Sequence, residues 1–143
     1  MKRQIWLSGM LLVGLALAVA ACEPASAPED TELTKNADGY TDIDVGQLAG
    51  MMTDKEFVLV NVHIPYQGEI PETDLFIPYD QVADNLGQLP DKDAPIVLYC
   101  RSGSMSTAAA QTLVELGYTS VLEVDGGFNA WKAAGNELLD KSQ

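Results

Sequence analysis

From residue 40 onward, the chain alternates between short apolar runs and stretches whose apolar residues recur at helical spacing. The apolar runs predict buried strands at residues 40–43, 57–62, 96–99 and 119–124. The intervening stretches predict helices at residues 45–52, 80–89, 107–116 and 128–134. Because strands and helices alternate, we predict a doubly wound α/β fold, in which a parallel sheet is covered by helices on both faces. Folds of this kind bind ligands at the carboxyl ends of their strands.

Individual residues support several of these boundaries. Asp44 is placed to cap the first helix, while Pro90 and Gly117 are placed to end the second and the third. Residues 63–78 predict a loop, because three prolines and a glycine there deny a regular helix. We expect the third helix to pack on the sheet through Ala108, Thr112, Val114 and Leu116.

The first 21 residues have the layout of a secretory signal. Lys2 and Arg3 precede an apolar stretch, residues 5–21. This stretch is shorter than a typical membrane span and is interrupted by glycine. The stretch ends in Val-Ala-Ala before Cys22, which resembles the lipobox of bacterial lipoproteins, where the cysteine is lipidated and begins the mature chain. An ordinary A-x-A cleavage site at residues 18–20 and an uncleaved signal anchor are the alternatives.

This interpretation divides the chain into four parts. Residues 1–21 form a lipoprotein signal peptide, and residues 22–39 form an acidic, proline-containing linker that begins at lipidated Cys22. Residues 40–136 form one folded domain, and residues 137–143 form a C-terminal tail. We therefore expect a protein of the cell envelope that is attached to the membrane by lipid and faces away from the cytoplasm, in the periplasm or at the cell surface.

Charge and residue counts exclude several functions. The chain has a formal net charge of −13 at pH 7, and removal of the signal peptide leaves six basic against 21 acidic residues. Such a surface repels nucleic acid, so we expect no nucleic-acid partner. With Cys22 lipidated, one cysteine and one histidine remain, which cannot fill a structural zinc site, and Cys100 lacks the nearby second cysteine of thioredoxin-like proteins. We expect no metal and no other cofactor.

The most informative segment is Cys-Arg-Ser-Gly-Ser-Met-Ser, residues 100–106. It joins the end of a predicted strand to the start of a helix. We expect the backbone N–H groups of this loop and the helix dipole to favour negative charge on the sulfur and to lower the pKa of Cys100. The Arg101 cation lies beside it in the sequence. The segment therefore predicts a nucleophilic thiolate, and a buried structural cysteine is the alternative.

Three segments in this order resemble a single-domain rhodanese: the strand end Asn61-Val62, the loop at residues 100–106, and Asp-Gly-Gly-Phe-Asn-Ala-Trp at residues 125–131. The resemblance covers about residues 40–135. It implies a rhodanese fold in which Cys100 accepts a sulfane sulfur as a persulfide and passes it to a thiol or to cyanide. It also implies an anion-binding active-site loop made of Arg101, Ser102, Gly103, Ser104, Met105 and Ser106.

The chain departs from the usual family pattern near the predicted site. Met105 stands where a second loop arginine is usual, Asn61 replaces a common aspartate, and His63 stands where an arginine is frequent. We predict that Asn61 and His63 border the pocket, and His63 is a candidate proton donor. Related phosphatases carry an arginine six residues after the cysteine. Ser106 at that position argues against hydrolysis of phosphate esters.

These residues favour a sulfurtransferase that uses Cys100, with a small sulfur donor and with a small thiol, cyanide or a thiol-bearing protein as the acceptor. A second hypothesis is a non-catalytic module of the same fold that binds an anion or a partner, and the missing loop arginine favours it. A third is redox sensing through oxidation of Cys100. We predict the first, because the nucleophile is intact.

Overall fold

A computed structural model describes residues 32–141 of the chain. The predicted signal peptide, lipidated Cys22 and the first part of the predicted linker lie outside the described residues. None of the helices between residues 32 and 141 has the length and apolar character that a membrane crossing requires.

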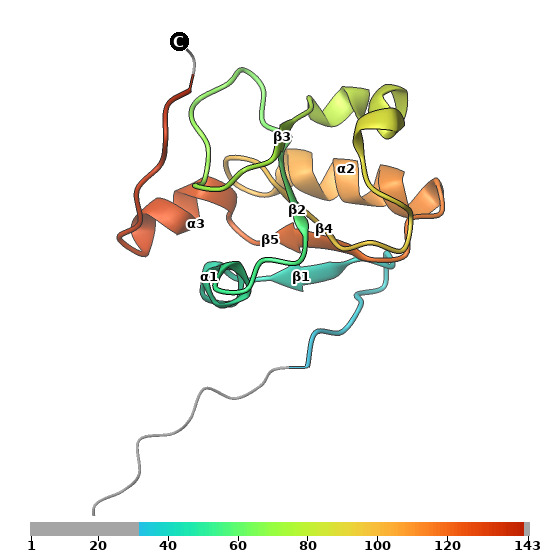
Figure 1. Cartoon of the computed structure of the whole chain (residues 1–143), viewed down its shortest axis with the longest axis horizontal. Helices are drawn as coiled ribbons and strands as arrows, with labels where there is room; N and C mark the ends of the chain where they lie inside the picture. Colours follow the sequence, from blue (N-terminus) through green and yellow to red (C-terminus); the bar gives the residue numbers. More distant parts are fainter. Residues whose placement is uncertain (1–31, 142–143) are drawn as a thin grey trace, which may run out of the picture. The chain divides into compact units, whose positions relative to one another are not determined.

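Five parallel strands form one sheet, with the order β1-β5-β4-β2-β3 (Figure 1). The strand that leads to Cys100 is central in this sheet and is paired on both sides, with β2 and with β5. The predicted α/β fold is therefore confirmed. The strands are β1 (Thr41–Ile43), β2 (Val58–Asn61), β3 (Leu75–Phe76), β4 (Ile96–Tyr99) and β5 (Val121–Val124).

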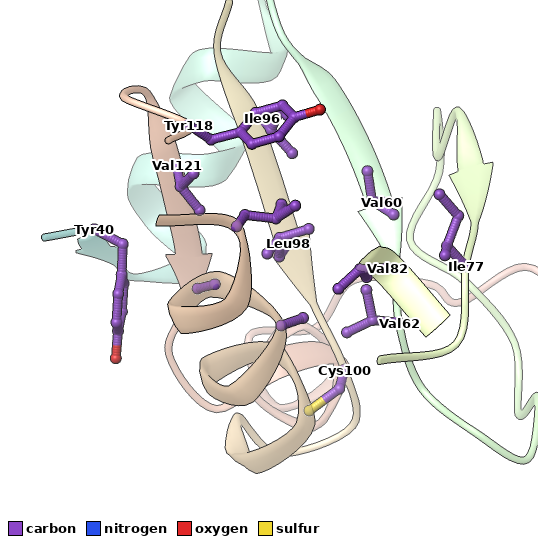
Figure 2. Packing of buried hydrophobic residues seen from close by; sticks show 13 residues of the cluster. Tyr40, Val60, Val62, Ile77, Val82, Ile96, Leu98, Cys100, Tyr118 and Val121 are labelled. Atoms are coloured by element: carbon purple, nitrogen blue, oxygen red, sulfur yellow. The ribbon is translucent and has the colours of Figure 1, made fainter. Parts of the chain in front are cut away.

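Helical segments cover the two faces of the sheet. One face packs against α2 and η1, and the other against α1 and α3, so that two apolar clusters form. Side chains of β4 and of the residue after it alternate between the clusters. Ile96, Leu98 and Cys100 point to the α2 side, as Figure 2 shows, and Val97 and Tyr99 point to the other. The helical segments are α1 (Val45–Met52), the 3-10 helix η1 (Tyr79–Gln88), α2 (Ser104–Glu115) and α3 (Gly127–Ala133).

The start of α2 differs from the prediction. The helix begins at Ser104 rather than at residue 107, so the last part of the predicted active-site loop is its first turn. The buried residues of α2 are Ser106, Ala109, Ala110 and Leu113. The predicted packing face of Ala108, Thr112, Val114 and Leu116 was therefore only partly right: all four residues are partly buried, and of these Val114 and Leu116 pack against the cluster on the α2 side. Ser106 faces the end of β4, and its hydroxyl oxygen lies 3.4 Å from the sulfur of Cys100.

The predicted helix at residues 80–89 is a 3-10 segment with an interruption. Asn85 has non-helical backbone angles, and its side chain donates a hydrogen bond of 2.8 Å to the carbonyl oxygen of Gln81. Asparagine competes with helix backbone bonds in this way. Leu89 is extended, as expected for a residue before proline.

The predicted loop at residues 63–78 also contains β3, a two-residue edge strand beside β2. Its backbone is held by β2, since the N–H group of Ile77 donates to the carbonyl oxygen of Asn61 at 3.0 Å. A strand this short leaves no alternation of residue types that sequence analysis can detect.

Residues near the C-terminus pack against the same loop region. Glu69 and Leu139 form an antiparallel bridge with two backbone hydrogen bonds of 2.7 and 2.8 Å. Lys141 makes an ion pair with the carboxylate of Glu69, and the indole N–H of Trp131 donates to the carbonyl oxygen of Glu137 at 2.8 Å. We call residues 137–141 the C-terminal strap.

Candidate active site

Cys100 lies directly after β4 and is buried, with 1% of its surface exposed. It is a free thiol. The chain turns sharply after it, and Gly103, which precedes α2, has a φ of 108°, a value that favours glycine. Arg101 and Ser102 are exposed on this turn, as is Ser104 at the start of α2. The strand, turn and helix of the predicted loop are therefore present, with the sulfur on their inner side.

Hydrogen-bond donors converge on the sulfur of Cys100. The N–H group of Gly103 lies 3.1 Å from Sγ, and the hydroxyl oxygen of Ser106 lies 3.4 Å from it. Burial raises the pKa of the thiol. Hydrogen bonds from the Ser106 side chain and from the N–H groups of Ser106, Ser102 and Gly103 lower this pKa, and together they outweigh the effect of burial. The net pKa of Cys100 is below its ordinary value, so the site favours the thiolate.

The loop is held by the beginning of α3. The N–H groups of Phe128 and Asn129 donate to the carbonyl oxygens of Cys100 and Arg101, at 2.9 and 3.0 Å. Gly127 permits this contact, because a Cβ atom there would lie 2.1 Å from the carbonyl oxygen of Cys100. The Gly-Gly element that we noted in the sequence thus fixes the backbone of the cysteine loop.

Asn61 is fully buried at the end of β2. Its Oδ1 accepts a hydrogen bond of 3.0 Å from the N–H group of His63, and its Nδ2 donates to the carbonyl oxygen of Gly68 at 3.1 Å. Both ends of the amide are therefore occupied by the backbone of the following loop. Asn61 positions this loop.

His63 is also buried, with 3% of its surface exposed, and its ring packs edge-on against Phe128 at 5.3 Å. Neither ring nitrogen has a hydrogen-bond partner of regular geometry. Burial lowers the pKa of His63, a contact with Gln67 raises it, and the charge of Arg101 lowers it; the net pKa is below 6.5. His63 is therefore neutral at pH 7 and near enough to Arg101 to sense its charge.

Met105 and Arg101 lie on different sides of the loop. Arg101 is exposed and is the only cation among residues 100–106. Met105 is half-buried and packs against the apolar cluster on the α2 side of the sheet. The position of the usual second arginine is thus occupied by an apolar side chain whose body belongs to the core.

Glu123 was not predicted as a site residue. This residue of β5 is 2% exposed, and its carboxyl oxygen makes a short hydrogen bond with the hydroxyl of Ser106. Burial raises the pKa of Glu123 to about 7; the bond to Ser106 lowers it, and the charges of Asp125 and Asp42 raise it. An acidic residue inside a strand that is buried on both faces was the available signal.

Glu123, Asp42 and Asp125 place carboxylate oxygens within 4.8 Å of one another. Of the described residues, these three are grouped closely enough to be considered as metal ligands. Glu123 is buried and already bonds to Ser106, whereas Asp42 and Asp125 are exposed. The Ser106 hydroxyl therefore already occupies one of the three carboxyl groups that a cation would need.

The sheet is all parallel, and its central strand ends at a cysteine whose thiolate is favoured by backbone N–H groups of the following turn. These features define an α/β protein with a cysteine nucleophile in an anion-binding loop. Residues 44–134 match the rhodanese-like domain family. The chain belongs to this family, as its three sequence segments indicated.

Similar proteins include a sulfurtransferase of Allochromatium vinosum, 37% identical over 102 residues, which are 68% of this chain and 94% of that protein. The thiosulfate sulfurtransferase GlpE of Vibrio cholerae is 32% identical over 98 residues, 68% of this chain and 92% of that protein. Among solved structures, a rhodanese-like domain protein of Staphylococcus aureus has a TM-score of 0.60 at 29% identity and covers 71% of this chain and 98% of its own.

Proposed function

We propose that this protein is a sulfurtransferase that carries sulfane sulfur as a persulfide on Cys100, in a chain tethered by lipid outside the cytoplasm. One observation carries the chemical part: the buried sulfur of Cys100 receives hydrogen bonds from Gly103 and Ser106, which stabilise an anion on it. The sulfurtransferase relatives support the same activity.

The reaction divides into two displacements. The Cys100 thiolate attacks the outer sulfur of the donor; a new S–S bond forms, and the donor's old bond to that sulfur breaks, so that sulfite or a thiolate leaves with the electron pair. An acceptor thiolate or cyanide then attacks the terminal sulfur of the persulfide, and Cys100 departs as a thiolate. The N–H groups at the start of α2 stabilise the sulfur anion at both stages.

The charges of the cysteine loop bear on which sulfur donor the protein uses. Thiosulfate carries two negative charges, and Arg101 is the only loop cation that faces solvent near Cys100. Met105 adds an apolar surface where the family usually has a cation. We therefore propose that an organic persulfide reacts faster than thiosulfate. Single-turnover rates with the two donors test this, and a faster thiosulfate reaction would contradict it.

The intact mass of residues 23–143 tests persulfide formation. This part contains the whole sheet, and the matched relatives span little more than such a domain. Treatment with either donor should add one sulfur atom, about 32 Da, and cyanide should remove it. Cys100→Ala should abolish the gain. No gain from a reduced, accessible thiol would refute the proposed activity.

A binding module of the same fold is the second candidate, and Met105 in place of the loop arginine is the observation that favours it. Cys100→Ser separates the two. A binding module should keep its affinity for thiosulfate after this change, whereas a transferase should lose all turnover.

The lipid tether rests on the sequence of residues 1–22, which lie outside the described residues. Radiolabelled fatty acid should enter the full-length protein in bacterial cells, and Cys22→Ser should abolish the label and release the domain from the membrane fraction. Retention of the Cys22→Ser protein in membranes without label would indicate an uncleaved signal anchor.

A further inference from the structure

A buried chain of polar atoms runs from the active-site sulfur to β5. The hydroxyl oxygen of Ser106 lies 3.4 Å from the sulfur of Cys100 and makes a short hydrogen bond to Oε1 of Glu123. Ser106 is fully buried and Glu123 is 2% exposed. A Cβ atom on Gly103 would lie 3.7 Å from the same carboxyl oxygen, which places this carboxyl group directly beneath the cysteine loop.

The hydroxyl proton of Ser106 is shared among several acceptors in this row of polar atoms. The hydroxyl of Ser106 has one proton and lies within reach of the Cys100 sulfur, the Glu123 carboxyl and, at 3.0 Å, the carbonyl oxygen of Gly103. When Glu123 is ionised, it takes the Ser106 proton as a hydrogen bond. When Glu123 is protonated, it donates to Ser106, whose own proton is then free to point at the thiolate.

Acidic groups act on the charge of Glu123. Asp42 on β1 and Asp125 after β5 both act on it, and the Cys100 thiolate lies beyond Ser106. Two buried anions so close together repel each other, because each is poorly solvated. Ionisation of Cys100 therefore favours a proton on Glu123.

We propose that Glu123 accepts the thiol proton of Cys100 through Ser106 and keeps this proton while the sulfur is anionic. The transfer is balanced: the S–H bond breaks as Ser106 Oγ gains that proton, while the original Ser106 proton moves to Oε1 of Glu123. The pair thereby changes from thiol and carboxylate to thiolate and carboxylic acid without loss of a proton to solvent.

The catalytic benefit of this proton transfer rests on the proposed function. Cys100 is anionic as a thiolate and as a persulfide, and both half-reactions bring a nucleophile or a leaving group that is itself negative. A neutral Glu123 beneath the loop reduces the negative charge that such a substrate meets. Glu123 is a positioning residue in this scheme, because it acts through Ser106.

The pH dependence of Cys100 alkylation by iodoacetamide tests the proposal in residues 23–143, where Cys100 is the only cysteine. From about pH 5 to about pH 9, the wild-type rate should rise in two steps, because the coupled pair loses two protons in sequence. Glu123→Gln should leave a single step, about one pH unit below the upper wild-type step. Asp125→Asn removes an exposed carboxylate of the same group and should keep both steps.

Infrared spectroscopy of the wild type gives a second readout that needs no variant to fold. At the same near-neutral pH, the band of a protonated carboxyl group should be stronger with a free Cys100 thiolate than after alkylation, which leaves a neutral sulfur. Equal bands, or two alkylation steps in Glu123→Gln, would overturn the proposal. Neither measurement requires sulfur transfer, so a protein with this coupling that forms no persulfide would refute only the proposed function.

Discussion

The N–H group of Phe128 donates a hydrogen bond of 2.9 Å to the carbonyl oxygen of Cys100. Cys100 is thus held by α3, a helix that follows β5 in the sequence. This helix begins at Gly127, 27 residues after Cys100. The contact requires close approach of two backbones, and Gly127 is where they meet.

Gly127→Ala should destabilise the protein by about 3 kcal/mol or more, because its Cβ would lie 2.1 Å from the carbonyl oxygen of Cys100 and backbone must move. Urea unfolding measures this loss. Gly135→Ala is the matched control: Gly135 also has a positive φ, 88°, but its Cβ would meet nothing within 4 Å. That change should cost only about 1–2 kcal/mol from backbone strain. Equal losses in the two variants would show that the contact with Cys100 is unimportant.

Met105→Arg should increase the single-turnover rate with thiosulfate about tenfold. It adds a second loop cation near Cys100, and the long arginine stem can cover the apolar cluster that Met105 now covers. The rate with an uncharged organic persulfide should stay within about twofold, since a neutral donor gains little from the charge. A rise with both donors would point to a change in the thiolate itself.

Asn61→Asp should destabilise the protein by about 1–3 kcal/mol, because a carboxylate cannot donate to the carbonyl oxygen of Gly68, which Asn61 now satisfies at 3.1 Å. Thermal or urea unfolding measures the loss. Asn85→Asp removes the same kind of bond, from Nδ2 to the carbonyl oxygen of Gln81, on the exposed side of η1. Solvent can replace that bond, so we expect a loss below about 1 kcal/mol.

Stability should depend on pH through Glu123. Its pKa rises from 4.5 to about 7 on folding, so the folded state binds more protons between these values. The stabilisation is therefore complete below pH 4.5 and is lost as the pH rises through about 7. The free energy of unfolding of the wild type, relative to Glu123→Gln, should fall by about 1–2 kcal/mol over this range. His63 acts in the opposite direction, since its lowered pKa reduces stability below pH 6.5, and it cancels in this difference. A flat difference would contradict the shift at Glu123.

Removal of the C-terminal strap beyond Glu137 should expose the loop that follows β2. The N–H group of Glu69 donates to the carbonyl oxygen of Leu139 at 2.7 Å, and Lys141 pairs with the Glu69 carboxylate. A chain that ends at Glu137 keeps the bond to Trp131 but loses both contacts. Hydrogen exchange at the Glu69 amide should then speed by about tenfold or more, while exchange in β4 stays unchanged. Unchanged exchange at Glu69 would mean that the strap does not protect the loop.

Sequence patterns predicted the parts of this protein that depend on local chemistry. The apolar run before Cys100 predicted a buried strand, the small residues after it predicted a turn into a helix, and both are present. The start of α2 at Ser104 was not predicted, because its first turn, Ser-Met-Ser, has little apolar periodicity. The interruption of η1 at Asn85, where the side chain bonds to the carbonyl oxygen of Gln81, is a feature that apolar spacing does not reveal.

The role of Glu123 was hidden for a different reason. Its position on the α2 side of β5 is opposite Leu98 of β4, so it reaches the cysteine loop only once the strands are in register. An acidic residue in a short apolar run is noticeable, but the hydroxyl that satisfies it lies 17 residues earlier on another element. Its burial and its partner both come from the sheet order.

The two outer strands of the sheet are short, three residues in β1 and two in β3. The unpaired backbone groups along a sheet's margins are the usual template on which a second molecule adds a strand and begins an aggregate. Edge strands this short offer an incoming chain few backbone N–H and C=O groups with which to form hydrogen bonds. If many copies are concentrated side by side on one membrane, this sheet gives them little means to polymerise edge to edge.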